Sequence, residues 1–222
     1  MNVLIVFAHP ETKSFNGALF GTAVKTLSAA GHTVATSDLY RMGFNPVSDR
    51  RNFTTVKEPD FLKLQIEEMH ATKVGGFAPD IEAELQKVEA ADLMIWQFPL
   101  WWFGLPAILK GWVDRVFAMG RTYGYGRTYA TGVFKGKRAL LSLTTGGPKE
   151  AYAPEGFNGD LDAILRPIQR GILEFTGFSV LRPEVFWQPV RVELAERQAW
   201  LEAWGDRLRR IEQESPIDVG RY

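Results

Sequence analysis

The stretch DLMIWQFPLWWFGLPAILKGWVDRVF, residues 92–117, contains the pattern that decides the fold. Residues 92–99 form a short apolar run of the kind found in strands that are buried on both faces. The later residues repeat apolar side chains at helical spacing, and Pro106 favours a helix start because a first helical turn does not need its missing N–H. The stretch therefore predicts a buried strand, a loop and a helix over residues 106–119.

The same alternation of strand and helix continues along the chain in both directions. Predicted strands cover residues 3–8, 32–38, 92–99, 138–146 and 178–186. Predicted helices lie near residues 16–30, 80–91, 106–119, 161–176 and 193–212. This alternation indicates an α/β three-layer sandwich, with a five-stranded parallel sheet between helices. The first, third and fourth strands are continuous apolar runs, which suit the centre of the flavodoxin-like strand order 2-1-3-4-5.

Composition narrows the classes of function. The 222 residues contain no linker rich in Gly, Ser or Pro, so we expect one domain over residues 1–222, with a C-terminal tail at 213–222. The 26 basic and 26 acidic residues balance without long runs of either sign, which argues against nucleic-acid or anionic-membrane partners. The absence of cysteine removes disulfides, thiolate nucleophiles and iron–sulfur clusters, and no metal site is expected. The apolar run at residues 3–8 is too short for a signal peptide or a membrane span, which favours a cytoplasmic enzyme or carrier.

Three unusual loops follow the strands at the edge where such folds bind ligands. The first, AHPETKSFN at residues 8–16, lacks the GxGxxG of a dinucleotide turn. Ser14 and Asn16 nevertheless open a helix whose free N–H groups could hold a phosphate, and Lys13 adds a positive charge. Ser14 could equally serve only as a helix cap, and His9 could be a hydrogen-bonded structural residue.

The second and third loops favour a flat ligand. The second loop places Trp101, Trp102 and Phe103 in succession, and consecutive side chains cannot all fold back under one helix. The third loop, TTGGPKEAY at residues 144–152, has two glycines that allow close backbone approach to a ligand. A simple turn would explain one of these glycines, but it has no use for two threonines and Tyr152 in the same place.

Four segments of the chain resemble the NAD(P)H:quinone oxidoreductases, two-electron-reducing flavoproteins also called DT-diaphorases. The segments are FNGAL after AHPETKS, QFPLWWFGLPAILKGWVDRVF, LSLTTGGPKEAY and RPIQRGILEFTGF, and the similarity runs in order from about Val3 to Ile211. The resemblance implies a flavodoxin-like fold and a homodimer with two active sites at its interface. It also implies bound FAD, with FMN as the other candidate, and hydride transfer from NAD(P)H through the flavin to a quinone.

The resemblance further implies three groups of site residues. The cofactor's phosphate loop would comprise His9, Ser14, Phe15, Asn16 and Ala18. Contacts to the flavin would come from Pro99, Leu100, Trp102, Phe103, Thr144, Thr145, Gly146, Gly147, Tyr152 and Arg197. The substrate pocket would comprise Trp102, Phe103 and Phe175, with Tyr123 and Tyr125 supplied across the dimer interface. Stacking of Trp102 and Phe103 on a flat ring is worth about 1 kcal/mol per pair beyond area burial.

The sequence departs from the family pattern at three places. Tyr152 is present as a proton-transfer residue, but Asn158 replaces the histidine that would assist it, and an amide cannot titrate. Trp101 replaces a polar residue, and we expect it at the subunit interface or under a helix. The chain ends at Tyr222 without the extension of longer members, so we expect part of the pocket to be more open or differently closed.

Two other classes of function compete with a quinone reductase. A flavodoxin-type electron carrier would share the fold, but such carriers are typically smaller and strongly acidic, whereas this chain has no net charge. A regulatory flavoprotein subunit of a transporter would share both the fold and the size. The aromatic loop favours the enzyme.

Overall fold

The computed structural model describes residues 1–221 and contains a parallel sheet in the order β2-β1-β3-β4-β5. The strands are β1 (Asn2–Phe7), β2 (Thr33–Asp38), β3 (Leu93–Pro99), β4 (Arg138–Thr145), β5 (Ser179–Val180) and β6 (Glu184–Trp187). The helices are α1 (Phe15–Ala29), α2 (Leu64–Val74), α3 (Pro79–Ala90), α4 (Ala107–Val116), α5 (Leu161–Ile168) and α6 (Leu194–Arg209). The predicted flavodoxin-like strand order is thus confirmed.

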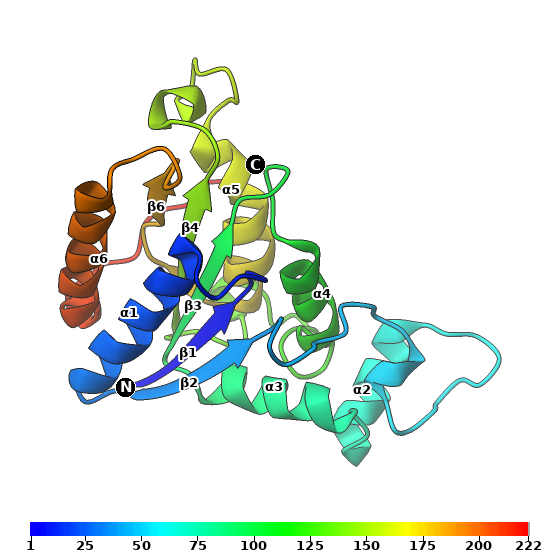
Figure 1. Ribbon diagram of the computed structural model, residues 1–222. Helices are drawn as coiled ribbons and strands as arrows, with labels where there is room; N and C mark the ends of the chain where they lie inside the picture. The colour runs from blue at the N-terminus through cyan, green and yellow to red at the C-terminus, as the bar shows by residue number, and fades with distance from the viewer. Residues whose placement is uncertain (222) are drawn as a thin grey trace.

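Helices cover both faces of the sheet (Figure 1). On one face α1 and α6 pack with Leu93, Ile95 and Leu140 in one apolar cluster. On the other face α3, α4 and α5 enclose a larger cluster that includes Trp96 and Phe98. Every residue of β3 is buried, as its continuous apolar run predicts for a central strand covered on both sides.

The last predicted strand is divided into two. Residues 178–186 form β5 and β6, which both pair with β4, so the sheet has six strands where the sequence predicted five. Pro183 lies between the two strands and has no N–H to donate to a ladder, which explains the interruption. The division matters for the site, because β6 extends alongside the carboxyl end of β4, where Thr145 lies beside Trp187.

Two helical features also differ from the prediction. The predicted helix at residues 161–176 is α-helical only to Ile168 and continues as a π-helix over Gln169–Glu174, directly after Pro167 interrupts the helical hydrogen bonds. Helix α2 was not predicted, because its inner face includes the carboxylates of Glu67 and Glu68 and has no continuous apolar stripe.

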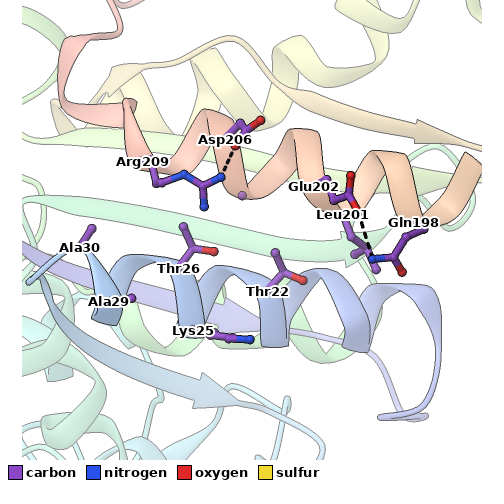
Figure 2. Close-up of a pocket in the computed structure, with 11 residues that line it drawn as sticks. Thr22, Lys25, Thr26, Ala29, Ala30, Gln198, Leu201, Glu202, Asp206 and Arg209 are labelled. Carbon is purple, nitrogen blue, oxygen red and sulfur yellow. Dashed lines mark hydrogen bonds and ion pairs between the residues drawn. The ribbon is translucent and has the colours of Figure 1, made fainter.

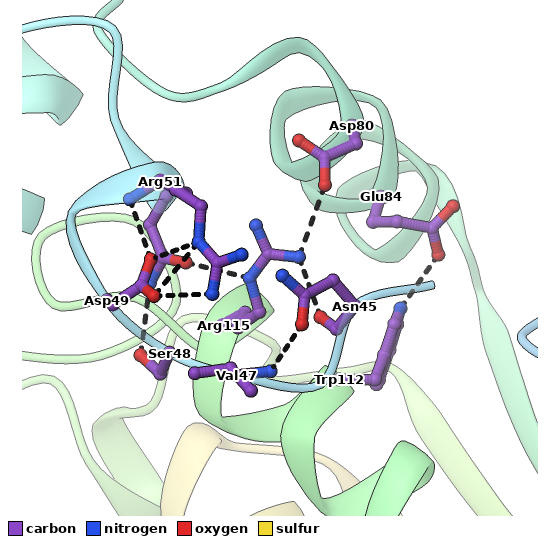
Figure 3. A network of polar contacts seen from close by, with 10 residues as sticks. Asn45, Val47, Ser48, Asp49, Arg51, Asp80, Glu84, Trp112 and Arg115 are labelled. Atoms are coloured by element: carbon purple, nitrogen blue, oxygen red, sulfur yellow. Dashed lines mark hydrogen bonds and ion pairs between the residues drawn. The ribbon is translucent and has the colours of Figure 1, made fainter. Parts of the chain in front are cut away.

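Buried polar contacts hold the long connection after β2 against helix α4 (Figure 3). The Arg115 side chain donates from Nε to Asn52 Oδ1 at 2.7 Å and from Nη1 to the Asn45 carbonyl at 2.8 Å. Next to it, Trp112 Nε1 donates to the buried carboxylate of Glu84 at 2.8 Å. These contacts fix α4, whose first turn follows the aromatic loop. None of the helices within residues 1–221 is both long enough and apolar enough to cross a bilayer.

Candidate active site

A cleft of about 440 Å³ opens at the carboxyl ends of β1, β3 and β4. It brings together most of the cofactor-binding residues expected from the sequence: His9, Ser14, Phe15, Asn16, Pro99, Leu100, Trp102, Thr144, Thr145 and Gly146. The three loops therefore meet at the switch point of the sheet, as the strand order predicts. The volume lies in the range of small-molecule sites, which is roughly 300–1,000 Å³.

One end of the cleft is the start of helix α1. Ser14 caps the helix, because its hydroxyl accepts from the Gly17 N–H at 3.2 Å, so the capping role is real. Within residues 1–221 no partner is present for the N–H groups of Phe15 and Asn16, and they remain available to an anionic ligand. A Cβ on Gly17 would lie 1.9 Å from the Thr12 carbonyl oxygen, so only glycine lets the first loop close over this turn.

His9 is held by the same loop. The Glu11 N–H donates to His9 Nδ1 at 3.0 Å, and the Ser14 hydroxyl lies 3.1 Å from the same nitrogen. The Glu11 carbonyl oxygen also lies 3.0 Å from Nδ1, so three polar groups of the loop surround this nitrogen. His9 has the hydrogen-bonded structural role that the sequence left open, and it lines the cleft as well.

The aromatic loop is a tight turn with an unusual backbone. Trp101 and Gly104 exchange two backbone hydrogen bonds of 3.2 and 3.0 Å, and the two residues between them have positive φ, 51° for Trp102 and 58° for Phe103. Such turns normally use Asn and Gly, because the left-handed conformation costs other residues roughly 1–2 kcal/mol each. The Trp102 side chain is also 97% exposed. Strain and exposure combined at the end of a buried strand indicate a ligand site.

Trp101 lies in the cleft. Its ring centroid is 6.1 Å from that of His9, and the side chain is partly exposed, so the prediction that places it under a helix is wrong. The reason is the turn itself, because backbone pairing with Gly104 holds Trp101 in the loop, where its side chain lines the cleft. Its position directly after Pro99 and Leu100 is the signal that could have placed it with them.

The glycine loop after β4 contacts two further predicted residues. A Cβ on Gly147 would lie 2.9 Å from Tyr152 Cε2 and 3.1 Å from Asn158 Nδ2, so both side chains pack against its Cα. Tyr152 is buried between Phe103 and Trp187, with ring centroids 6.4 and 5.6 Å away. Tyr152 and Asn158 thus lie together beside the loop. Among residues 1–221 we find no partner for the N–H groups of Gly146 and Gly147, which leaves two donors for a ligand.

Two residues that were predicted to contact the cofactor, Arg197 and Ala18, lie behind the residues that line the cleft. Arg197 Nη1 donates to the Pro189 carbonyl at 3.2 Å, and Pro189 lines the cleft, so the guanidinium supports the wall. Ala18 lies one turn inside α1, and its N–H bonds to the Ser14 carbonyl at 3.0 Å.

The remaining substrate-pocket residues lie apart from the cleft in a single chain. Tyr123 and Phe175 have ring centroids 5.7 Å apart and line a separate cavity of about 220 Å³ with Glu68. Tyr125 is exposed and directs its hydroxyl toward Met69 Sδ at 3.1 Å. Burial raises the pKa of the Tyr123 hydroxyl and of the Glu68 carboxyl. The homodimer that would bring these rings to a cleft stays a prediction.

A fourth loop, which the sequence did not suggest, completes the cleft. Pro189 and Val190 line it, and Gln188 Nε2 donates to the Gly146 carbonyl at 3.2 Å from a backbone with φ 49°. The carboxyl-end rule would have indicated this loop had the last strand been assigned to end at Trp187.

A hollow on the helical layer is unrelated to these loops. It is a groove of about 620 Å³ between α1 and α6 (Figure 2). Two pairs of polar side chains lie along α6 in this groove, Arg209 with Asp206 and Gln198 with Glu202. None of the predicted site residues lines it. Within residues 1–221 there is no group of three His, Cys, Asp or Glu side chains that could hold a metal.

The sheet order and the cleft at its switch point define a flavodoxin-like protein with an aromatic ligand site. Residues 1–208 match a family model for the flavodoxin-like fold. Human ribosyldihydronicotinamide dehydrogenase (quinone) is 46% identical over 216 residues, which is 97% of this chain and 94% of the relative. Rat NAD(P)H dehydrogenase (quinone) 1 is 46% identical over 215 residues, which is 96% of this chain and 78% of the relative. The chain belongs to this family of quinone dehydrogenases, as its motifs predicted.

Solved structures agree with this assignment. A crystal structure described as a quinone reductase from Klebsiella pneumoniae has a TM-score of 0.93 and 41% sequence identity, and the match covers 98% of this chain and 87% of that one. An NAD(P)H:quinone oxidoreductase from Methanothermobacter marburgensis has a TM-score of 0.71 and 28% identity, covering 96% and 97% of the two chains.

Proposed function

We propose that this protein is a flavin-dependent dehydrogenase that uses NAD(P)H to reduce quinones, with FAD as its flavin, and that it works as a single-domain homodimer. The observation that carries the proposal is the left-handed turn that exposes Trp102 at the mouth of a cleft whose N–H donors have no partner among residues 1–221. The family supports the two substrates, because its members are named for NAD(P)H or ribosyldihydronicotinamide and for quinone. The choice of FAD over FMN rests on the resemblance.

The residues present fit a flavin. The N–H groups of Phe15 and Asn16 suit a phosphate, and those of Gly146 and Gly147 suit the polar edge of the ring system. A Cβ on Gly146 would meet no atom within 4 Å, so the backbone faces open space there. The aromatic side chains of the turn supply the apolar wall that a flat ring requires.

When bound, a flavin accepts a hydride from a nicotinamide and passes it to a second substrate. The residues of this chain bind and orient the reactants. Trp102 and Phe103 would shape the place where nicotinamide and quinone stack in turn, and the Gly146 and Gly147 N–H groups would stabilise negative charge on the edge of the flavin ring. Tyr152 lies beside the glycine loop, and its hydroxyl can donate a hydrogen bond to a bound reactant.

The cofactor test comes first. The purified protein should be yellow, and chromatography of the supernatant after heating should identify FAD. A colourless protein that stays colourless with added FAD and FMN would disprove the proposal. Steady-state rates with NAD(P)H and a quinone should give parallel double-reciprocal lines, because one site serves both substrates in turn. A one-electron carrier or a regulatory subunit would show no such turnover.

The dimer has a separate test. Tyr123, Tyr125 and Phe175 lie apart from the cleft of their own chain, so they serve the site only if a second copy supplies them. Light scattering at micromolar concentration should give twice the mass of 25.0 kDa. A fully active monomer would contradict this part of the proposal.

A further inference from the structure

A chain of hydrogen bonds connects the middle of the sheet to the cleft. Gln97 on β3, Asn16 in the first turn of α1 and Thr144 on β4 are 1%, 4% and 6% exposed. Gln97 Nε2 donates to Asn16 Oδ1 at 2.8 Å, and Asn16 Nδ2 donates to Thr144 Oγ1 at 2.8 Å. Asn16 and Thr144 line the cleft, whereas Gln97 lies beneath it.

The chain has a direction, because an amide has one donor end and one acceptor end. Gln97 donates, so Asn16 must present its oxygen to Gln97 and its NH₂ group to Thr144. The Thr144 oxygen is then an acceptor within the protein, and within residues 1–221 its own hydroxyl hydrogen has no acceptor. That hydrogen is left for a ligand in the cleft.

Burying the Gln97 amide costs free energy that an apolar side chain of similar size would not cost. Its Oε1 is buried without a hydrogen-bond partner among the described residues, and a methionine would fill similar space without an unpaired oxygen. The donor end of the amide is the part that this structure uses. Ser142, opposite Gln97 in the strand register, is equally buried, and its hydroxyl makes no hydrogen bond within the described chain. Ser142 therefore lies beside Gln97 in the sheet but takes no part in the chain of hydrogen bonds.

We propose that Gln97 is a positioning residue that acts through Asn16 to keep the Thr144 hydroxyl a donor to an acceptor atom of the bound flavin. The inference rests on the proposed function and adds to it a residue that does not touch the ligand. It also gives Asn16 a role in orienting Thr144, besides the N–H that it offers at the start of α1.

The test reverses the direction of the chain. At a pH high enough to ionise it, a buried Gln97→Glu side chain can only accept, so the Asn16 amide turns its NH₂ toward residue 97 and its oxygen toward Thr144. The Thr144 hydroxyl then donates to Asn16 and is lost to the flavin. We expect the flavin dissociation constant, measured by fluorescence titration of the flavin-free protein, to rise about tenfold, as for one lost hydrogen bond. Ser142→Ala is the matched control and should change it less than about twofold.

A double-mutant cycle separates positioning from general damage. Thr144→Val removes the donor directly, so Gln97→Glu and Thr144→Val should weaken binding by similar factors, and the double variant should be no weaker than Thr144→Val alone. The flavin midpoint potential should move in the same direction in both single variants. Circular dichroism of the flavin-free proteins checks that each variant folds. If the Gln97→Glu variant does not fold, Gln97→Met is used in its place.

Two results would overturn the inference. Fully additive effects of the two substitutions would show that Gln97 does not act through Thr144. A loss in Ser142→Ala as large as that in Gln97→Glu would show that any change in this layer weakens the site. A wild-type protein that binds no flavin would be recognised before any variant is made, and it would refute the proposed function together with this inference.

Discussion

At the scale of single residues, Gly147 is the position in the glycine loop with the least room. A Cβ there would meet Tyr152 at 2.9 Å and Asn158 at 3.1 Å, whereas a Cβ on Gly146 would meet nothing within 4 Å. Gly147→Ala should therefore destabilise the flavin-free protein by about 1–3 kcal/mol through overpacking. Gly146→Ala, the control, should leave the free energy of unfolding unchanged or slightly higher, because its φ suits alanine. Urea unfolding of both variants checks this, and equal losses would contradict it.

A second residue-scale prediction concerns proton delivery. Asn158 packs beside Tyr152 against the glycine loop, in the position where the family resemblance places a histidine. An amide does not titrate, so the rate of quinone reduction should be nearly flat between about pH 6 and 8. Asn158→His should introduce an inflection near the ordinary histidine pKa of about 6.5. Stopped-flow measurement of flavin reoxidation across pH decides this, and a histidine-like inflection in the unmodified enzyme would refute it.

At the scale of elements, the turn from Trp101 to Gly104 lowers the stability of the protein while it provides the stacking surface of the proposed site. Trp102 has φ 51° and is almost fully exposed, so replacing it loses little burial and removes backbone strain. Trp102→Asn should raise the free energy of unfolding of the flavin-free protein by about 0.5–1 kcal/mol, because asparagine tolerates this conformation. The same change should slow both half-reactions through loss of the stacking surface. Trp101→Asn is the control, since Trp101 has no positive φ and should gain no stability.

The differences between predicted and observed elements have local causes. The last strand divides at Pro183, and the helix after residue 161 changes to a π-helix after Pro167. Apolar periodicity locates an element but does not register a missing N–H inside it. Helix α2 was not predicted because it lacks apolar periodicity: its buried face includes Glu67 and Glu68. Such carboxylates look like surface residues in a sequence until their partners are known.

At the scale of the whole molecule, buried Glu68 couples stability to pH. Its carboxylate accepts from the Met119 N–H at 2.7 Å, and burial raises its pKa. The folded state then holds its proton to higher pH than the unfolded state, so stability falls as pH rises from the ordinary carboxyl range through the raised pKa. Glu68→Gln, which keeps an acceptor for Met119, should therefore raise the melting temperature at pH 8 and change it little at pH 4.5. An equal gain at both pH values would contradict this assignment.

The sequence by itself determined the strand order, the central position of β3 and the three loops of the cleft. Apolar runs, glycines and prolines act locally, so their pattern survives without knowledge of contacts. The tertiary structure decided the rest: the fourth loop at Gln188, the place of Trp101, and the separation of Tyr123 from the cleft of its own chain. The tertiary structure alone revealed the hydrogen bonds that connect Gln97, Asn16 and Thr144. Gln97 and Asn16 are 81 positions apart in the sequence, and Asn16 and Thr144 are 128 positions apart. A hydrogen bond across such distances depends on how the sheet and α1 pack together, which no local pattern encodes.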